Sequence, residues 1–134
     1  MKRILLCLSL AFSLSLFGAN YTKAQRLNDM HKMASGMEMI QKGFLYRCPD
    51  GSCFKKGANK ILKVVKTLET QEVKDFLPIH QKYAYKFGEK SAKMIALYAN
   101  DLKDSVAHKD QADVLEDYNQ MLRQCASCHL RLRQ

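Results

Sequence analysis

Hydrophobic residues recur at spacings of three and four over most of the chain, which is the period of an amphipathic α-helix. The first such segment runs from about Thr22 to Tyr46. Its apolar positions are predicted to share one face: Leu27, Met30, Ala34, Met37, Ile40 and Phe44. The second segment runs from about Phe54 to Leu68, with a stripe made of Phe54, Ala58, Ile61, Val65 and Leu68.

Two further segments complete the pattern. Pro78 suits the first turn of a helix because its missing N–H is not needed there, so the third segment is predicted from about Ile79 to Val106. Its shared face holds Phe87, Ser91, Met94, Ile95, Tyr98 and Leu102. The fourth runs from about Asp110 to the C-terminus, with Leu115, Tyr118, Leu122, Cys125 and His129 along one side. No run alternates with period two, so we expect an all-α, antiparallel four-helix bundle.

The first two predicted helices are separated by Cys48-Pro49-Asp50-Gly51-Ser52-Cys53. Pro-Asp-Gly favours a tight turn, because proline presets φ and glycine accepts positive φ. Two cysteines that flank a turn in an exported protein most simply form a disulfide, and a pair of free thiols is the alternative. Closing so short a loop stabilises the fold by about 2–3 kcal/mol in the chain-entropy description.

Export is suggested by the first nineteen residues. Lys2 and Arg3 precede an apolar run from Ile4 to Phe17 that is short for a membrane span, which is typical of a secretory signal peptide. Cleavage is expected after Ala19, or as late as Ala24, and an uncleaved anchor is the alternative. We expect residues 20–134 to form the mature domain in the periplasm, and Cys7 to leave with the signal peptide.

The chain is basic, with 22 Lys and Arg against 13 Asp and Glu among 134 residues. Residues 1–19 hold two basic and no acidic residues, so the mature net charge is +7. Export and the spread of basic residues along the chain argue against nucleic acid as a partner. A positive surface that steers acidic protein partners is the simpler expectation.

Candidate chemistry lies at the C-terminus, in Cys125-Ala126-Ser127-Cys128-His129. Two cysteines three apart followed at once by histidine form the attachment motif of c-type haem. Positions i, i+3 and i+4 of a helix face the same way, so both sulfurs and the imidazole can meet one flat group. Cys125 and Cys128 would form thioethers with haem, and His129 would be the proximal iron ligand.

Three other readings of the same cysteines remain open. A thioredoxin-like dithiol needs the pair at the start of a helix that follows a strand, and no strand is predicted here. A zinc site needs further ligands, for which Cys48 and Cys53 are available but distant in sequence. A structural disulfide within the motif would leave the adjacent His129 unexplained.

The second axial position of the iron would separate the possible functions. The first predicted helix carries Met30, His31, Met33, Met37 and Met39 within ten residues. Methionine is also a common filler of cores, so packing is the default role of any one of them. His80 and His108 carry no spacing signal, and surface or packing roles are expected for them.

A C-terminal C-x-x-C-H in a small, exported, four-helix protein resembles the class II cytochromes c, which comprise cytochrome c′ and its low-spin, methionine-ligated relatives. In that family an apolar and a basic residue commonly follow the motif, and Leu132 and Arg133 match. An Arg of the first helix commonly precedes the residue over the iron by one turn, which Arg26 and Met30 match. The Cys48–Cys53 loop is not a usual family feature.

The resemblance implies that Met30 lies over the iron as its ligand and that Met33 lies near the haem edge, with Met33 the second choice as ligand. Arg26, Leu132 and Arg133 are then candidates for the haem pocket. His31 points about 100° away from Met30 on a helix and is a surface or outer-pocket residue.

His/Met ligation of a single haem is expected of an electron carrier rather than of an enzyme. Its complexes with redox partners are expected to be weak and transient. Its partners would be periplasmic or membrane-bound redox proteins with acidic docking surfaces, and the resemblance allows a monomer or a homodimer. The alternative is a five-coordinate, cytochrome c′-like protein that binds nitric oxide or carbon monoxide. A small peroxidase is a third reading, for which His31 is the only available distal acid–base group.

Overall fold

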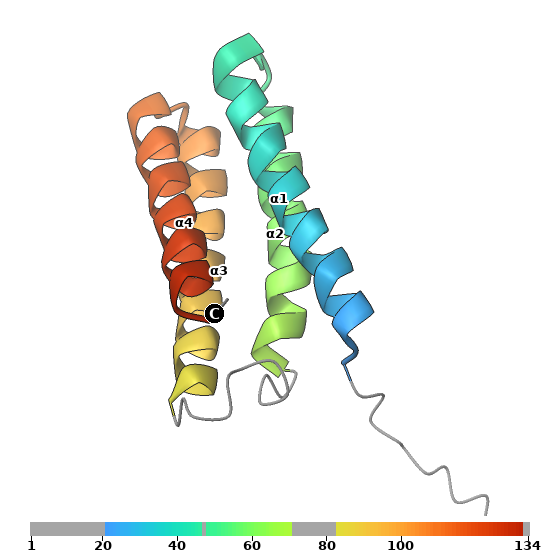
Figure 1. Cartoon of the computed structure of the whole chain (residues 1–134). Helices are drawn as coiled ribbons and strands as arrows, with labels where there is room; N and C mark the ends of the chain where they lie inside the picture. Colours follow the sequence, from blue (N-terminus) through green and yellow to red (C-terminus); the bar gives the residue numbers. More distant parts are fainter. Residues whose placement is uncertain (1–20, 47, 71–82, 133–134) are drawn as a thin grey trace, which may run out of the picture.

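The chain folds into four α-helices in an up-down-up-down arrangement (Figure 1). A computed structural model describes residues 21–46, 48–70 and 83–132, and no strand occurs in these ranges. The helices are α1 (Lys23–Tyr46), α2 (Ser52–Thr70), α3 (Ala84–His108) and α4 (Gln111–Leu132). This confirms the predicted all-α class and four antiparallel helices. The third helix begins at Ala84, with Tyr83 at its N-cap, so the predicted helix from about Ile79 is wrong at Tyr83. The predicted signal peptide, Pro78 and Ile79 lie outside the described residues.

The helices pack in chain order, so that α1 lies against α2, α2 against α3 and α3 against α4. By contrast α1 and α4 contact each other only weakly, and Figure 1 shows α1 leaning away from α4 toward its N-terminal end. The core therefore lies mainly between successive helices. Its most deeply buried side chains are Ile40, Ile61, Val65, Leu102 and Met121.

Glycines bring α1 and α2 into close contact. A Cβ added to Gly36 would lie 2.9 Å from the carbonyl oxygen of Gly57, and one added to Gly57 would lie 2.6 Å from the carbonyl oxygen of Gly36. A Cβ on Gly43 would meet Cys53 Sγ at 2.7 Å. The two backbones can approach this closely only because these positions have no side chain.

This contact rotates α1 relative to the face predicted for it. The residues that α1 buries are Asp29, Met33, Gly36, Ile40 and Gly43. Of the predicted face, Ile40 is fully buried, but Ala34 is exposed and Leu27 keeps 45% of its surface exposed. The predicted face was therefore only partly correct, because hydrophobic periodicity does not register a helix contact made by glycines.

The fourth helix shows a similar offset. Its core positions are Val114 and Met121, against which Tyr118 and Cys125 pack with partial burial. Leu115 and Leu122, predicted to share that face, remain 47% and 48% exposed. The apolar side of α4 is thus wider than the surface that its neighbours cover.

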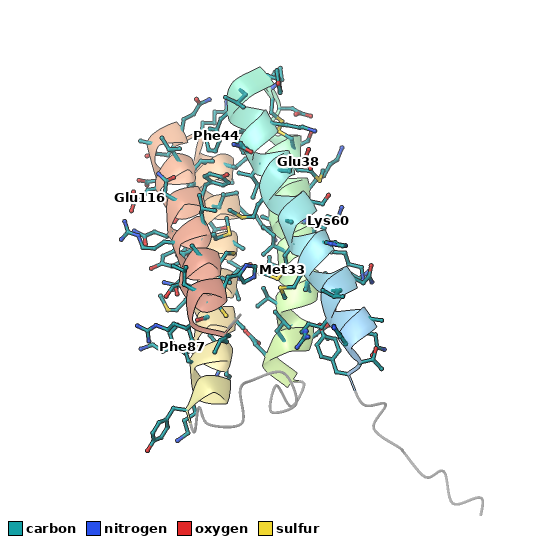
Figure 2. All side chains as sticks on the ribbon, in the orientation of Figure 1. Met33, Glu38, Phe44, Lys60, Phe87 and Glu116 are labelled. Atoms are coloured by element: carbon teal, nitrogen blue, oxygen red, sulfur yellow. A yellow bond between two sulfur atoms is a disulfide. The ribbon has the colours of Figure 1, made fainter. Side chains whose placement is uncertain are left out.

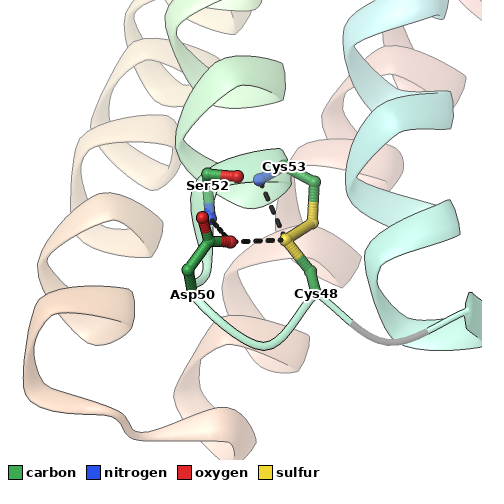
Figure 3. The surroundings of a disulfide bond; sticks show 4 residues. All are labelled: Cys48, Asp50, Ser52 and Cys53. Carbon is green, nitrogen blue, oxygen red and sulfur yellow. Dashed lines mark hydrogen bonds between the residues drawn. A yellow bond between two sulfur atoms is a disulfide. The ribbon is translucent and has the colours of Figure 1, made fainter.

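The turn between α1 and α2 contains a disulfide between Cys48 and Cys53, the pairing expected from the sequence (Figure 3). Within it, Asp50 Oδ1 accepts a hydrogen bond from the Ser52 N–H at 3.0 Å. Gly51 has φ of +67°, the left-handed conformation that glycine adopts without strain. The turn lies at the opposite end of α1 from the Met30–Met33 region.

Polar groups define other helix ends. Thr22 and Gln25 form reciprocal hydrogen bonds at the start of α1, where the Gln25 N–H donates to Thr22 Oγ1 and the Thr22 N–H donates to Gln25 Oε1. Asp110 Oδ1 caps α4 by accepting from the N–H groups of Ala112 and Asp113. Among the described helices, none is apolar enough over a sufficient length to span a membrane.

Candidate functional site

The C-terminal half of α4 presents the three residues of the C-x-x-C-H motif in different surroundings. Cys125 is half-buried and packs against the hydrophobic core. Cys128 is half-buried beside α3, where its thiol shares a hydrogen bond with the buried Ser91. His129 is exposed. The motif therefore lies along the border between the core and the surface of the bundle.

Both motif cysteines are free thiols, whereas Cys48 and Cys53 are paired. Burial, with a smaller contribution from the neighbouring Cys128, raises the pKa of the Cys125 thiol to about 11. Burial also raises the pKa of Cys128, while the hydrogen bond with Ser91 opposes that shift. Both groups are protonated at neutral pH. They are unlike the acidic nucleophilic cysteine of a thioredoxin-like site.

One contact fixes the register between α1 and α4. The rings of Phe44 and Tyr118 meet edge to face with centroids 5.7 Å apart. Figure 2 labels Phe44 near the upper end of α1 and Met33 lower on the same helix. The helices are antiparallel and each residue advances a helix by the same rise. A residue a given number of positions before Phe44 therefore lies at the same height along the bundle axis as the residue that many positions after Tyr118. Met33 is eleven residues before Phe44, and His129 is eleven residues after Tyr118. Met33 and His129 are therefore at matching heights, and both lie close to the face that carries the ring contact.

The α4-directed side of α1 is apolar and only partly covered. Met37 and Met30 lie two and four turns from Phe44 on this side, and both are half-buried. Leu27 lies about one turn beyond Met30 toward the N-terminus of α1 and is 45% exposed. Met33 lies at the edge of this strip, is 7% exposed and belongs to the core.

A matching strip runs down α4 from Tyr118. Leu122, Cys125 and His129 follow it at helical spacing, and Leu122 and His129 are exposed. We call these two strips, together with Met33, the α1–α4 seam: Leu27, Met30, Met33 and Met37 on α1, and Leu122, Cys125 and His129 on α4. The helices meet at the Phe44–Tyr118 end of the seam and diverge toward the other (Figure 1).

The seam has the donor set and the polarity that a c-type haem requires. It provides the free thiol of Cys125, the exposed imidazole of His129 four residues later, and thioether sulfurs on the facing helix, while the second free thiol, Cys128, lies at its border beside α3. Its remaining residues are apolar, and large exposed apolar side chains on facing helices are typical of a surface that accommodates a ligand. The residues present therefore fit a haem between α1 and α4.

The other predicted pocket residues are placed as follows. Arg26 and Leu132 are half-buried, near the open end of the seam, and Arg133 lies outside the described residues. His31 is exposed, and His108 sits at the end of α3 with Nδ1 2.9 Å from the Asp104 carbonyl oxygen. His80 lies outside the described residues.

The competing readings of the motif find little support. Cys125 lies deep in the second half of α4, with no preceding strand in the described residues. Cys48 and Cys53 are at the far end of the bundle and are bonded to each other. Within the described ranges, no three His, Cys, Asp or Glu side chains come close enough together to hold a metal ion.

Two polar residues near the site had no function in the sequence-based prediction. Ser91 was placed on the apolar stripe of the third helix, yet its buried hydroxyl is the polar partner of Cys128. Arg131 places its guanidinium carbon 4.6 Å from the centroid of the Phe87 ring, which holds the end of α4 against α3. Only the tertiary packing of α3 on α4 identifies these pairs.

Comparison with known proteins finds no similar protein. No family model, no curated protein and no solved structure matches this chain.

Proposed function

We propose that this protein is a periplasmic monohaem c-type cytochrome that carries electrons through a His/Met-ligated haem iron. Cys125 and Cys128 would bind the haem covalently as thioethers, and His129 would be its proximal ligand. The observation that carries the proposal is the C-x-x-C-H motif with both thiols free, in which Cys125 and His129 follow the side of α4 that continues from Tyr118, and an apolar strip with methionines lies on α1.

A bound haem would supply reversible one-electron chemistry at its iron. The chain's own residues set the conditions for it. Leu27, Met37 and Leu122 would provide apolar contacts that shield a bound haem from water. The imidazole of His129 and a methionine thioether would offer neutral donors from opposite helices. A neutral thioether favours ferrous iron, which raises the reduction potential. Packing of α1 on α2 through Gly36 and Gly57 restrains the helix that carries the methionine.

Two methionines are candidates for the distal ligand. The resemblance to class II cytochromes c favours Met30, which lies on the half-buried strip facing α4. The register through Phe44 and Tyr118 favours Met33, which is level with His129. Because Met33 is 7% exposed and packs in the core, it would have to turn toward the seam to reach an iron there.

The first test is the absorption spectrum of protein matured with haem, in both oxidation states. A low-spin ferric spectrum with a sulfur-to-iron charge-transfer band is expected. Met30→Leu or Met33→Leu should convert it to a high-spin spectrum, and the one that does so identifies the ligand. Met39→Leu, on another side of α1, is the matched control and should leave the spectrum unchanged.

Two outcomes would contradict the proposal at different levels. A five-coordinate, high-spin spectrum in the unmodified protein would favour the alternative, a cytochrome c′-like protein that binds nitric oxide or carbon monoxide. An intact mass without an added haem, from cells that mature other c-type cytochromes, would overturn both. Cys125→Ser and Cys128→Ser should each remove one thioether, which is read by acid–acetone extraction of the haem.

Export and partners require separate tests. Residues 1–24 fused to a reporter that folds only outside the cytoplasm would show whether they direct export. The mature net charge of +7 would favour acidic redox proteins by steering their approach. Reduction rates with an acidic partner should fall steeply as salt is added, and sedimentation would distinguish a monomer from a homodimer.

A further inference from the structure

One helix carries an unusually uniform charge on its outer surface. In α2, the structure describes seven exposed positions, and five of them are lysines: Lys55, Lys56, Lys60, Lys63 and Lys66. The other two are Asn59 and Glu69. The sequence suggested that basic residues were spread along the chain, but folding gathers these five on one side of α2. We call them the α2 lysine face.

Several lysines of the neighbouring helices form ion pairs with carboxylates of their own helix. On α1, Asp29 pairs with Lys32 and Glu38 pairs with Lys42, and on α3 Glu89 pairs with Lys93. Lys60 donates to the neutral Ser35 Oγ at 2.8 Å on the α1 side, within reach of the field of Glu38. Lys56 is influenced by Asp50, and Glu69 stands at the far end of α2 beside Lys93. The face therefore keeps a strong net positive charge.

The position of this face separates it from the candidate haem site. Helix α2 packs between α1 and α3, and the seam lies between α1 and α4. The lysines cover the outside of α2, whose apolar side is buried in the core through Ala58, Ile61 and Val65. A partner held on the lysine face would leave the seam free on another side of the bundle.

The composition of the face distinguishes between anionic partners. Specific protein interfaces concentrate their binding energy in tyrosine, tryptophan and arginine, and none of these occurs among the seven exposed positions. Lysine is a flexible, strongly hydrated point charge without the fork geometry of arginine. Four to eight such charges on one helix face suit a diffuse anionic plane, of which a phospholipid surface is the usual example.

We propose that the α2 lysine face binds the surface of an anionic phospholipid membrane. The contact is electrostatic and peripheral, because the apolar side of α2 is already used by the core. Such a contact would hold the protein at the membrane with its α1–α4 seam accessible. The inference depends on the charge of α2 and not on the presence of haem.

Sedimentation with vesicles tests it, using the mature protein as purified from the periplasm. Binding is expected to vesicles of equal parts phosphatidylglycerol and phosphatidylcholine, and not to pure phosphatidylcholine. Raising the salt from about 0.1 M to about 1 M shortens the Debye length from about 10 Å to about 3 Å and should release the protein.

Charge-matched variants identify the surface. The triple variant Lys55→Gln, Lys56→Gln, Lys63→Gln should weaken binding about a hundredfold, since each lysine near the membrane contributes about a fivefold factor. The control Lys90→Gln, Lys103→Gln, Arg123→Gln removes three charges from α3 and α4, and should weaken binding by less than about fivefold. Helical circular dichroism should be the same for both variants.

Three results would overturn the proposal. Equal losses in the two triple variants would mean that only net charge matters. No binding to the anionic vesicles at low salt would exclude a lipid surface. Binding to poly-glutamate but not to these vesicles, at the same salt, would assign the face to an acidic protein instead. Haem content measured on the same samples shows independently whether the proposed function holds.

Discussion

Phe44 of α1 and Tyr118 of α4 form an edge-to-face pair, 5.7 Å between ring centroids, at the point where the first and last helices meet. Phe44 also packs on Phe54 of α2, with centroids 4.9 Å apart. The pair closes one end of the α1–α4 seam and sets the height of each α1 residue relative to the C-x-x-C-H motif.

We expect a measurable coupling between these two rings. Aromatic pairs of this geometry contribute about 0.5–1.5 kcal/mol beyond the area that they bury. A double-mutant cycle with Phe44→Leu and Tyr118→Leu, followed by urea unfolding, should return a coupling energy in that range. A cycle of Phe44→Leu with Leu115→Ala, on the exposed side of α4, should show additive effects. Additivity in the first cycle would show that the ring contact does not join the helices.

Because of the glycine contact between α1 and α2, we expect a glycine-to-alanine substitution there to change stability in the direction opposite to that given by helix propensity. Alanine normally stabilises a helix relative to glycine by about 1 kcal/mol. Gly57→Ala should instead destabilise the protein by about 1–3 kcal/mol, because its Cβ would lie 2.6 Å from the Gly36 carbonyl oxygen. Thermal unfolding of Gly57→Ala beside Asn59→Ala, an exposed position on the same helix, gives the comparison. A Gly57→Ala variant as stable as the parent would rule out so close an approach.

The start of α1 bears on the expected signal cleavage. Thr22 and Gln25 form the capping hydrogen bonds, and the Tyr21 hydroxyl donates to the buried Asp29 at 2.8 Å. Cleavage after Ala19 keeps these groups, whereas cleavage after Ala24 removes Tyr21 and Thr22. Thr22→Ala should cost about 1 kcal/mol of stability in a chain that begins at Asn20. A chain that begins at Gln25 should melt at a lower temperature than either, and equal melting of all three would show that this end is dispensable.

We expect that replacing Asp117 increases the stability of the fold by an amount that depends on pH. Burial raises the pKa of its carboxyl group, an effect that nearby Asp101 reinforces and the Ser105 hydroxyl, 3.1 Å from Oδ2, opposes. A raised pKa means that the folded state binds the proton more tightly than the unfolded state. The ionised group therefore destabilises the fold above its folded-state pKa, and this penalty disappears as the pH falls below its unfolded value.

Asp117→Asn should accordingly be more stable than the parent at pH 7, by less than about 1 kcal/mol because the group remains partly solvated. The difference should vanish near pH 3, where both side chains are neutral. Urea unfolding at several pH values measures it. Asp113→Asn, on the exposed first turn of α4, is the comparison: it relieves repulsion on Asp117 but loses a favourable interaction with the helix dipole, so it should gain less stability at neutral pH than Asp117→Asn. A parent more stable than Asp117→Asn at pH 7 would reverse the assigned sign.

The sequence predicted the helices well because their signals are local. Apolar spacing located all four, and their described ends agree with the structure within two residues, except at the start of the third helix, which lies at Ala84 and not near Ile79. Local chemistry also predicted the turn closed by Cys48 and Cys53. The faces were predicted less well. Gly36, Gly57 and Asp29 form part of the buried surface around α1, and none of them counts as apolar in a periodicity argument.

By itself, the sequence determined the helical class and the order of Cys125, Cys128 and His129 on one side of a helix, because both follow from spacing along a single chain segment. Tertiary structure decided which side of α1 is buried and that Met33 is level with His129. These properties depend on how helices distant in sequence approach one another. Contacts such as Gly36–Gly57 and Phe44–Tyr118 set that approach, and no single segment contains both partners.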